Sequence, residues 1–211
     1  MKVLRATGSL FIFLGLSILF FVLYELVGTS AITKGHQSAL QREFTAQLAQ
    51  PATLGPEFTG GLGLGRQRSG GVHALARLKI PSISVNVIVV EGVSLDDLSY
   101  GPGHYPQTDL FDDESGVVGV AGHRTGWSAP FFNFDKLGPG DEVIVETTKA
   151  TYTYRVTDTT IVSPSHSEVL DGNPKSTAKM QLVLTTCTPK FTARDRLIIF
   201  TDLVKTVART T

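Results

Sequence analysis

The sequence predicts an all-β domain, a sandwich or barrel of short strands. Short runs with alternating or continuous apolar residues recur from about residue 73 onward, and turn residues separate them at regular intervals. No long helical pattern interrupts these runs. The 211 residues are enough for one compact domain with appendages.

The N-terminal part differs in composition. Lys2 and Arg5 precede an apolar run from Ser9 to Val27 in which Glu25 is the one charged residue. A run of roughly 19 residues approaches the length that crosses a bilayer as a helix. Basic residues beside such a run are expected to stay in the cytoplasm, which would place the rest of the chain outside.

We therefore predict a cytoplasmic N-terminus over residues 1–8 and a single-pass transmembrane signal-anchor helix over residues 9–28. The alternative is a cleaved signal peptide, because small residues follow at Gly28–Ala31. The apolar run exceeds the usual length of the apolar core of a signal peptide, about 7–15 residues, which favours an uncleaved anchor in the cell membrane with the domain outside.

Residues 29–71 are predicted to form an extracellular stalk and linker. Apolar residues recur every four positions at Leu40, Phe44 and Leu48, which fits either a short amphipathic helix or a flexible stalk. The segment 51–71 is too rich in glycine to pack and is interpreted as a linker. The folded domain is then expected over residues 72–205, with a C-terminal tail over 206–211.

The strands of this domain are predicted from β-branched and apolar patterns between turn residues. Pro81 is expected to bend the first pair, and Ser94 to cap one helical turn over residues 94–98. Residues 130–137 are expected to form a short irregular cover. The predicted strands cover residues 74–80, 82–91, 115–123, 142–146, 151–156, 159–162, 179–186 and 196–204.

Charge and composition exclude several function classes. The chain carries 19 basic and 19 acidic residues, so no nucleic-acid binding is predicted. The acidic segment Asp109–Glu114 does not have the spacing of an EF-hand, and an acidic loop is usually only solvated. No metal and no cofactor are predicted.

Cys187 is the only cysteine in the chain and the first candidate for chemistry. It stands at the end of a predicted strand, and Arg196 begins the next one. If these strands pair as a hairpin, a thiol and a permanent cation lie at the same edge of the sheet. A single cysteine outside the cytoplasm indicates a reactive thiol or an intermolecular link, whereas the alternative is a buried, inert thiol.

A nucleophilic thiolate needs a nearby cation or histidine and donors for the oxyanion. Of the five histidines, His123 alone follows an apolar strand in the way that Cys187 does. A histidine at a strand end is more often structural than catalytic, so the pattern makes His123 a candidate and leaves both readings open. The other four are His36, His73, His104 and His166.

Here the residues resemble a known family. The segments Leu184–Lys190 and Ala193–Ile198 are similar to the cysteine and arginine signatures of the sortases, and Ala121–Thr125 to the histidine motif. Further segments resemble class E sortases, the housekeeping enzymes of high-GC Gram-positive bacteria: Gly92–Leu95, Gly101–Pro106, Gly138–Glu142 and Thr151–Val156. One departure is Thr188, where many class E members have histidine.

The resemblance implies a closed β-barrel of about eight strands with short helices. It implies that Cys187 is the nucleophile, His123 the acid–base group and Arg196 the residue that holds the substrate and stabilises the oxyanion. Arg194 is a rival that falls inside the loop. Thr186 is expected to contact the substrate, and Tyr105 either to read the second residue of the signal or to be a structural tyrosine.

The implied function is a membrane-anchored cysteine transpeptidase. It would cleave an LAXTG- or LPXTG-like signal between Thr and Gly through a thioacyl intermediate. Its partners would be secreted proteins with a C-terminal sorting signal and the amine of a lipid-linked peptidoglycan precursor. The alternatives are an extracellular cysteine peptidase that hydrolyses the same peptide and a non-catalytic, membrane-anchored binding module.

Overall fold

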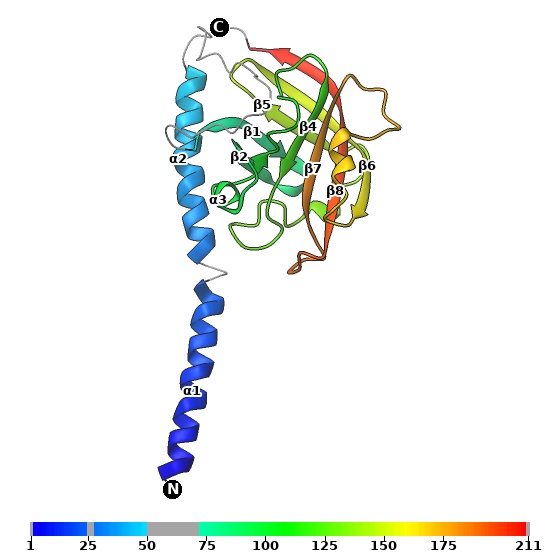
Figure 1. Ribbon diagram of the computed structural model, residues 1–211. Coiled ribbons are helices and arrows are strands. Elements are labelled where there is room, and N and C mark those ends of the chain that lie inside the picture. Colours follow the sequence, from blue (N-terminus) through cyan, green and yellow to red (C-terminus); the bar gives the residue numbers. More distant parts are fainter. Residues whose placement is uncertain (1, 25–27, 50–71, 210–211) are drawn as a thin grey trace.

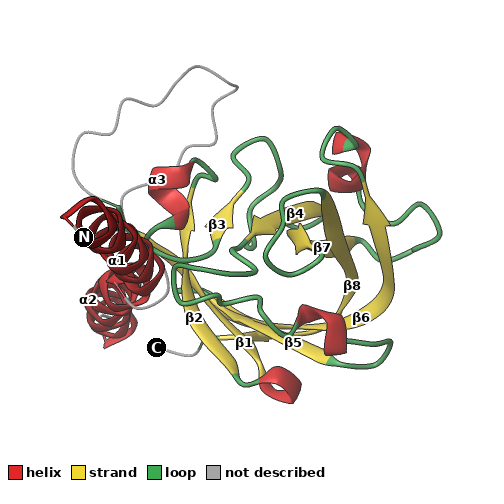
Figure 2. Cartoon of the chain, turned by 90° about the horizontal axis from the view of Figure 1, so that it is seen from below, coloured by secondary structure: helices red, strands yellow, loops and turns green. Residues whose placement is uncertain are grey.

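The computed structural model describes residues 2–24, 28–49 and 72–209. Its main body is a closed β-barrel in the strand order β1-β2-β3-β4-β7-β8-β6-β5, seen end-on in Figure 2. The predicted all-β class and the closed barrel of about eight strands are therefore confirmed. The strands are β1 (Ala74–Ile80), β2 (Val85–Glu91), β3 (Gly103–His104), β4 (Gly116–Ala121), β5 (Glu142–Glu146), β6 (Ala150–Val162), β7 (Met180–Thr188) and β8 (Asp195–Ala208).

Short helical segments connect these strands, and two longer helices precede the barrel (Figure 1). Ser94 caps α3 as predicted, through a reciprocal capping box with Asp97. Pro81 begins a 3₁₀ turn that bends the chain between the first two strands. The helices are α1 (Lys2–Leu23), α2 (Thr29–Ala49) and α3 (Leu95–Leu98), and the 3₁₀ turns are η2 (Pro81–Ile83), η3 (Phe134–Lys136) and η4 (Ser167–Asp171).

The barrel mixes antiparallel hairpins with parallel pairings between distant strands. The pairs β1–β2, β5–β6 and β7–β8 are antiparallel, whereas β4 and β7 pair in parallel over six residues, from Gly116↔Met180 to Ala121↔Thr185. Parallel strands need a long crossover, and here β5, β6 and η4 lie between β4 and β7 in the chain. This pairing brings the ends of β4 and β7 to one edge of the barrel.

The barrel interior is filled by apolar side chains from all sides. Met180, Leu182 and Leu184 of β7 belong to this core, whereas Val183 packs outside the barrel with Ile198 and Phe200 of β8. Alternate residues of β7 therefore face inward and outward. Continuing the alternation, Thr186 faces inward and Cys187 outward.

The N-terminal helix α2 packs directly on the barrel. Leu40 and Phe44 are buried against Ile88 and Val90 of β2, and Leu48 is partly buried beside them. Gln37 forms hydrogen bonds with the backbone of Ile88 in both directions. Of the two alternatives for this segment, the structure shows the helix and no free stalk over residues 29–49. The predicted linker 51–71 lies outside the described residues.

Helix α1 continues away from the barrel beyond the start of α2 (Figure 1). The predicted transmembrane helix over residues 9–28 includes residues 25–27, which lie outside the described part. Among the residues that are described, no helix is both long and apolar enough to cross a membrane, so the prediction of a spanning helix is not confirmed.

Several strand boundaries differ from the prediction. The two segments predicted at 151–156 and 159–162 form one strand, β6, with a register irregularity between Val156 and Asp158 where it pairs with β8. Strand β8 continues to Ala208, past the predicted domain end at residue 205. Within the predicted turn 101–106, Gly103 and His104 form β3, because they bridge β2 and β4.

Candidate active site

Cys187 and Arg196 are direct partners on β7 and β8. Directly opposed residues of an antiparallel pair have Cβ atoms about 4.5–5.5 Å apart and point to the same face of the sheet. The thiol and the guanidinium therefore share the outer face of the barrel, as the hairpin hypothesis expected. The Nη1 of Arg196 donates to the carbonyls of Ala193 and Asp195, at 3.1 and 3.2 Å, which fixes one side of its guanidinium.

His123 reaches the same edge through the parallel pairing of β4 with β7. Ala121 pairs with Thr185, so two further residues along each chain lead to His123 and Cys187. Gly122, between them, is tied to β7 twice: its amide donates to the Thr185 carbonyl at 3.1 Å, and its carbonyl accepts from the Thr186 hydroxyl at 2.8 Å. The structure thus places the candidate histidine, cysteine and arginine at one edge.

The environment of His123 favours its neutral form. Burial lowers the pKa of the imidazole below its ordinary value of 6.5, because a charged ring would lose hydration there. Its Nε2 is buried and has no hydrogen-bond partner among the described residues. On one side the ring stacks with Trp127, with 6.3 Å between the ring centroids.

The loop after His123 has a strained backbone. Three successive residues, none of them glycine, have positive φ angles: Trp127 at 48°, Ser128 at 62° and Ala129 at 42°. This conformation brings Cβ close to the carbonyl oxygen and costs about 1–2 kcal/mol per residue. The amide of Ala129 donates to the Gly126 carbonyl at 2.7 Å, closing the turn. Strain of this kind persists only where surrounding contacts hold it.

An ion-pair chain connects the two loops of the site. Arg124, only 3% exposed, pairs with Asp135 at 3.0 Å, and Lys190 of the β7–β8 loop pairs with the other oxygen of Asp135 at 3.1 Å. Burial alone would raise the pKa of Asp135, but the Lys190 hydrogen bond and the two positive charges outweigh it and hold that pKa below 3.8. Lys190 also lies 4.3 Å from the ring centroid of Phe132.

The two predicted substrate contacts lie in different surroundings. The hydroxyl of Tyr105 is 2.9 Å from the Thr185 hydroxyl, on the same face of β7 as Cys187. Gly119 leaves space for the Tyr105 ring, because an added Cβ would lie 2.9 Å from it. Thr186 is 3% exposed and uses its hydroxyl on Gly122. It thus holds β7 against the segment that precedes His123.

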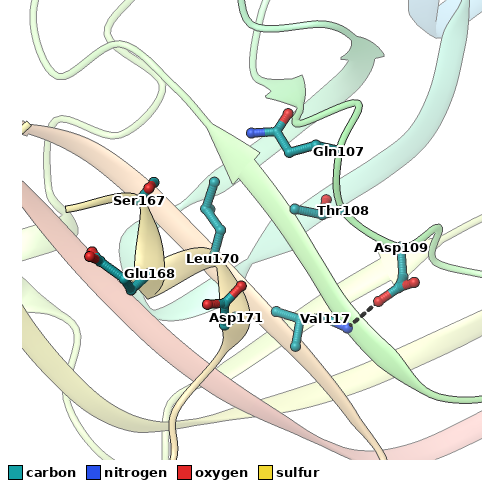
Figure 3. A pocket seen from close by; sticks show the side chains of 8 residues that line it. All are labelled: Gln107, Thr108, Asp109, Val117, Ser167, Glu168, Leu170 and Asp171. Atoms are coloured by element: carbon teal, nitrogen blue, oxygen red, sulfur yellow. Dashed lines mark hydrogen bonds between the residues drawn. The ribbon is translucent and has the colours of Figure 1, made fainter. Parts of the chain in front are cut away.

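A hollow of about 480 Å³ lies on the outer face of the barrel, between β4 and η4 (Figure 3). Val117 and Leu170 supply its apolar surface, while three carboxylates, those of Asp109, Glu168 and Asp171, line it as well. Asp109 uses its carboxylate to accept the amide of Val117 at 2.7 Å. Leu170 of η4 also packs over Gly119, where an added Cβ would lie 3.1 Å from it. The hollow therefore lies along β4, whose far end pairs with β7 next to Cys187.

The other candidates lie elsewhere. His104 is buried in a 2.9 Å contact with Glu91, and His36 stacks on Tyr100 beside α2. His73 pairs with Glu43, and His166 bonds to Ser163. Arg194 is 73% exposed and pairs with its neighbour Asp195. None of these contacts reaches Cys187.

Three neighbours of the site were missed by the sequence analysis. Trp127 is the only tryptophan of the chain and follows His123 by four residues, a signal that could have been read. Arg124 lies in the same motif as His123. For Asp135 no local signal exists, because its partners Arg124 and Lys190 come from two different loops.

Comparison with known proteins gives a consistent result. A family model described as a sortase domain matches residues 78–204. Sortases SrtE1 and SrtE2 of Streptomyces coelicolor are each 33% identical, over 95% and 94% of this chain. The crystal structure of sortase E1 from the same organism, with a tripeptide in its active site, matches with a TM-score of 0.61 and 35% identity, covering 64% of this chain and 91% of that chain. The chain spans 57% of the length of SrtE1 and 81% of that of SrtE2.

Proposed function

Because this chain belongs to the sortase family of cysteine transpeptidases, we propose that it cuts a short sorting signal and joins the upstream part to an amine. The main support for this proposal is that Cys187, His123 and Arg196 come from three separate segments and lie at one edge of the barrel. A thiol, an imidazole with a free nitrogen and a fixed cation are the groups that acyl transfer through a thioester requires.

The thiolate of Cys187 attacks the carbonyl carbon of the scissile peptide bond. The negative charge that develops on the carbonyl oxygen is stabilised by Arg196, whose guanidinium stays protonated and offers planar donors. His123 as imidazolium gives its proton to the leaving amine, and the C–N bond breaks to leave a thioester on Cys187. The neutral imidazole then takes a proton from the incoming amine, which attacks the thioester and releases the thiolate.

The outer face of β4 suits an extended peptide as substrate. Gly119 precedes His123 by four residues, which is about 13 Å along an extended chain. Four substrate residues upstream of the cut bond would span the same length, from Cys187 to the wall formed by Leu170. We propose a pentapeptide signal of the LAXTG or LPXTG kind, as the resemblance to class E sortases implies. Tyr105 borders this path beside Thr185, where it would contact the signal.

We also propose that the enzyme works at the outer side of the cell membrane, with its N-terminus in the cytoplasm. Lys2 and Arg5 lie in the first turns of helix α1, before its apolar part, and large apolar side chains of this helix from Leu10 to Leu23 are exposed. This location would bring it to secreted proteins with a C-terminal sorting signal and to a lipid-linked peptidoglycan precursor that offers an amine. Protease digestion of intact spheroplasts should remove the barrel domain and spare a cytoplasmic marker.

The activity is tested with a peptide that contains LAXTG, a parallel one with LPXTG, and a glycine-type amine. Mass spectrometry should show a joined product with the wild-type chain and none with Cys187→Ala. Cleavage without joining would favour the cysteine peptidase. If neither peptide reacts and the thiol resists alkylation at neutral pH, the chain is a binding module.

A further inference from the structure

The start of helix α2 is bonded to the strained loop that follows His123. The hydroxyl of Ser128 donates to the Ser30 carbonyl at 2.9 Å. The amides of Trp127 and Ser128 lie 3.3 Å from the hydroxyl oxygens of Thr29 and Ser30, which accept from them. These contacts join residues that are 98 positions apart in the chain. A helix that precedes the barrel therefore holds a loop of the candidate active site.

The contacts fall on the residues that need support. Trp127 and Ser128 both have positive φ angles, so their conformation requires restraint from outside the loop. Trp127 is also the residue whose ring stacks on His123. On its other side the loop is closed by the Phe131 amide, which donates to the His123 carbonyl at 3.1 Å. The position of the indole over the imidazole thus depends on both ends of the loop.

We propose that Thr29 and Ser30 are positioning residues for His123, acting through Ser128 and Trp127, so that α2 takes part in building the active site. The proposal rests on the function proposed above for His123. Displacement of a catalytic group by about 1 Å can cost 100-fold in rate, so a loop held from outside has a direct kinetic effect. We expect a loosened loop to move the indole away from the imidazole and to expose that ring to water, which would raise its pKa.

The remainder of α2 is fixed to the barrel by contacts that do not touch this loop. Thr33, one turn further along, donates to the Ser99 carbonyl at 3.0 Å and to the Thr29 carbonyl at 3.1 Å, and Phe44 packs on β2. Thr29 and Thr33 are both buried, and each places its hydroxyl toward a backbone group of the barrel domain. Thr33→Val removes a buried hydroxyl from the same helix without removing a hydrogen bond to the loop, so it serves as the control for Thr29→Val.

The test uses the full chain in detergent micelles and two readouts. The pKa of the His123 ring is measured by NMR with labelled histidine, and the pH profile of kcat/KM is measured with the sorting-signal peptide. The titratable and charged groups around His123 are Arg124 on its own loop, Cys187 on β7 and Arg196 on β8. The substitutions change none of them, because the contacts from α2 are hydroxyl and carbonyl groups.

The variant Thr29→Val with Ser128→Ala should raise the pKa of His123 toward its ordinary value and lower kcat/KM about tenfold at neutral pH. Thr33→Val should leave both unchanged. Thr29→Ser, which keeps the hydroxyl that accepts from the Trp127 amide, should retain the wild-type pKa. If the double variant fails to fold, Thr29→Val alone is compared with Thr29→Ser.

A pKa and a pH profile that match those of Thr33→Val would overturn the proposal. The NMR readout does not depend on turnover, so it decides the positioning role even if the wild-type chain fails to join peptides. In that case the proposed function fails while a raised pKa in the double variant still supports the link between α2 and His123.

Discussion

Cys187 and Arg196 face each other across β7 and β8, one pair before the last pair of that ladder, Thr188 and Asp195. The thiol of Cys187 is thus positioned by the regular strand β7, while Arg196 lies at the start of β8, directly after the β7–β8 loop. Two hydrogen bonds to backbone carbonyls leave the remaining guanidinium N–H groups of Arg196 to other partners. This geometry predicts that the shape of the cation matters as much as its charge.

Arg196→Lys should lower kcat/KM about 100-fold or more, because an ammonium keeps the charge but loses the planar set of donors. Peptide joining at saturating amine measures the loss. Arg194→Lys, in the loop two residues before Arg196, exposed and paired with Asp195, serves as the control and should stay within about twofold of wild type. Equal losses in the two variants would remove Arg196 from its assigned role.

His123 should make the protein less stable in mild acid. Its pKa in the folded state is lowered by burial, so between the folded and unfolded values the unfolded chain binds more protons. The free energy of unfolding therefore falls as the pH drops below about 6.5 and stops responding below the folded pKa. His123→Gln should remove this part of the pH dependence in urea titrations; an unchanged slope would contradict the burial effect.

The strands of the barrel could be predicted from the sequence where their pattern is local. Alternation gives β1 and β5 with the predicted boundaries, and the N-cap serine Ser94 gives α3. The parallel pairing of β4 with β7 was not readable, because its partners are far apart and continuous apolar runs carry no pairing information. The resemblance to the sortases implied a closed barrel of about eight strands but not this pairing.

The packing of α2 on the barrel could not be predicted from the sequence either. Its apolar residues, Leu40, Phe44 and Leu48, fit a packed helix and a solvated one equally, and a glycine-rich segment separates them from the barrel. The deciding contacts are polar and non-local: Gln37 bonds to β2, and Ser30 to Ser128. Pairings between distant backbone groups leave no periodic signal along the chain.

Asp135→Asn should destabilise the protein, because the buried guanidinium of Arg124 loses its charged partner. Leaving a buried donor without that partner costs about 1–3 kcal/mol. Chemical denaturation measures the change. The matched control is Glu142→Gln, whose ion pair with Arg155 is about half exposed on both sides and should contribute under about 1 kcal/mol.

The acid stability of the Asp135 variant gives a second check. Because the pKa of Asp135 is lowered in the folded state, its contribution is present above about pH 4 and is lost as the pH falls through the folded value. The difference between wild type and Asp135→Asn should therefore shrink below pH 4. A difference that stays constant down to pH 2 would exclude the ion pair as its source.

Phe44→Ala should cost about 3–5 kcal/mol of unfolding free energy, as removal of a fully buried phenylalanine from a packed core does. Thermal unfolding followed by circular dichroism should show one lowered transition, because α2 and the barrel share a core. Ser38→Ala on the exposed side of the same helix is the control. If Phe44→Ala leaves the free energy of unfolding unchanged, α2 is not a stable part of the domain in solution.

If Cys187 carries the acyl group, the intact mass of the enzyme reveals the thioester. The full chain is mixed with an LAXTG or LPXTG peptide in the absence of amine, quenched in acid and weighed. We predict a mass gain equal to the acyl fragment that ends at Thr, mapped to Cys187 and discharged when a glycine-type amine is added. Peptide cleavage that persists in Cys187→Ala, or an acyl group on another residue, would contradict the account.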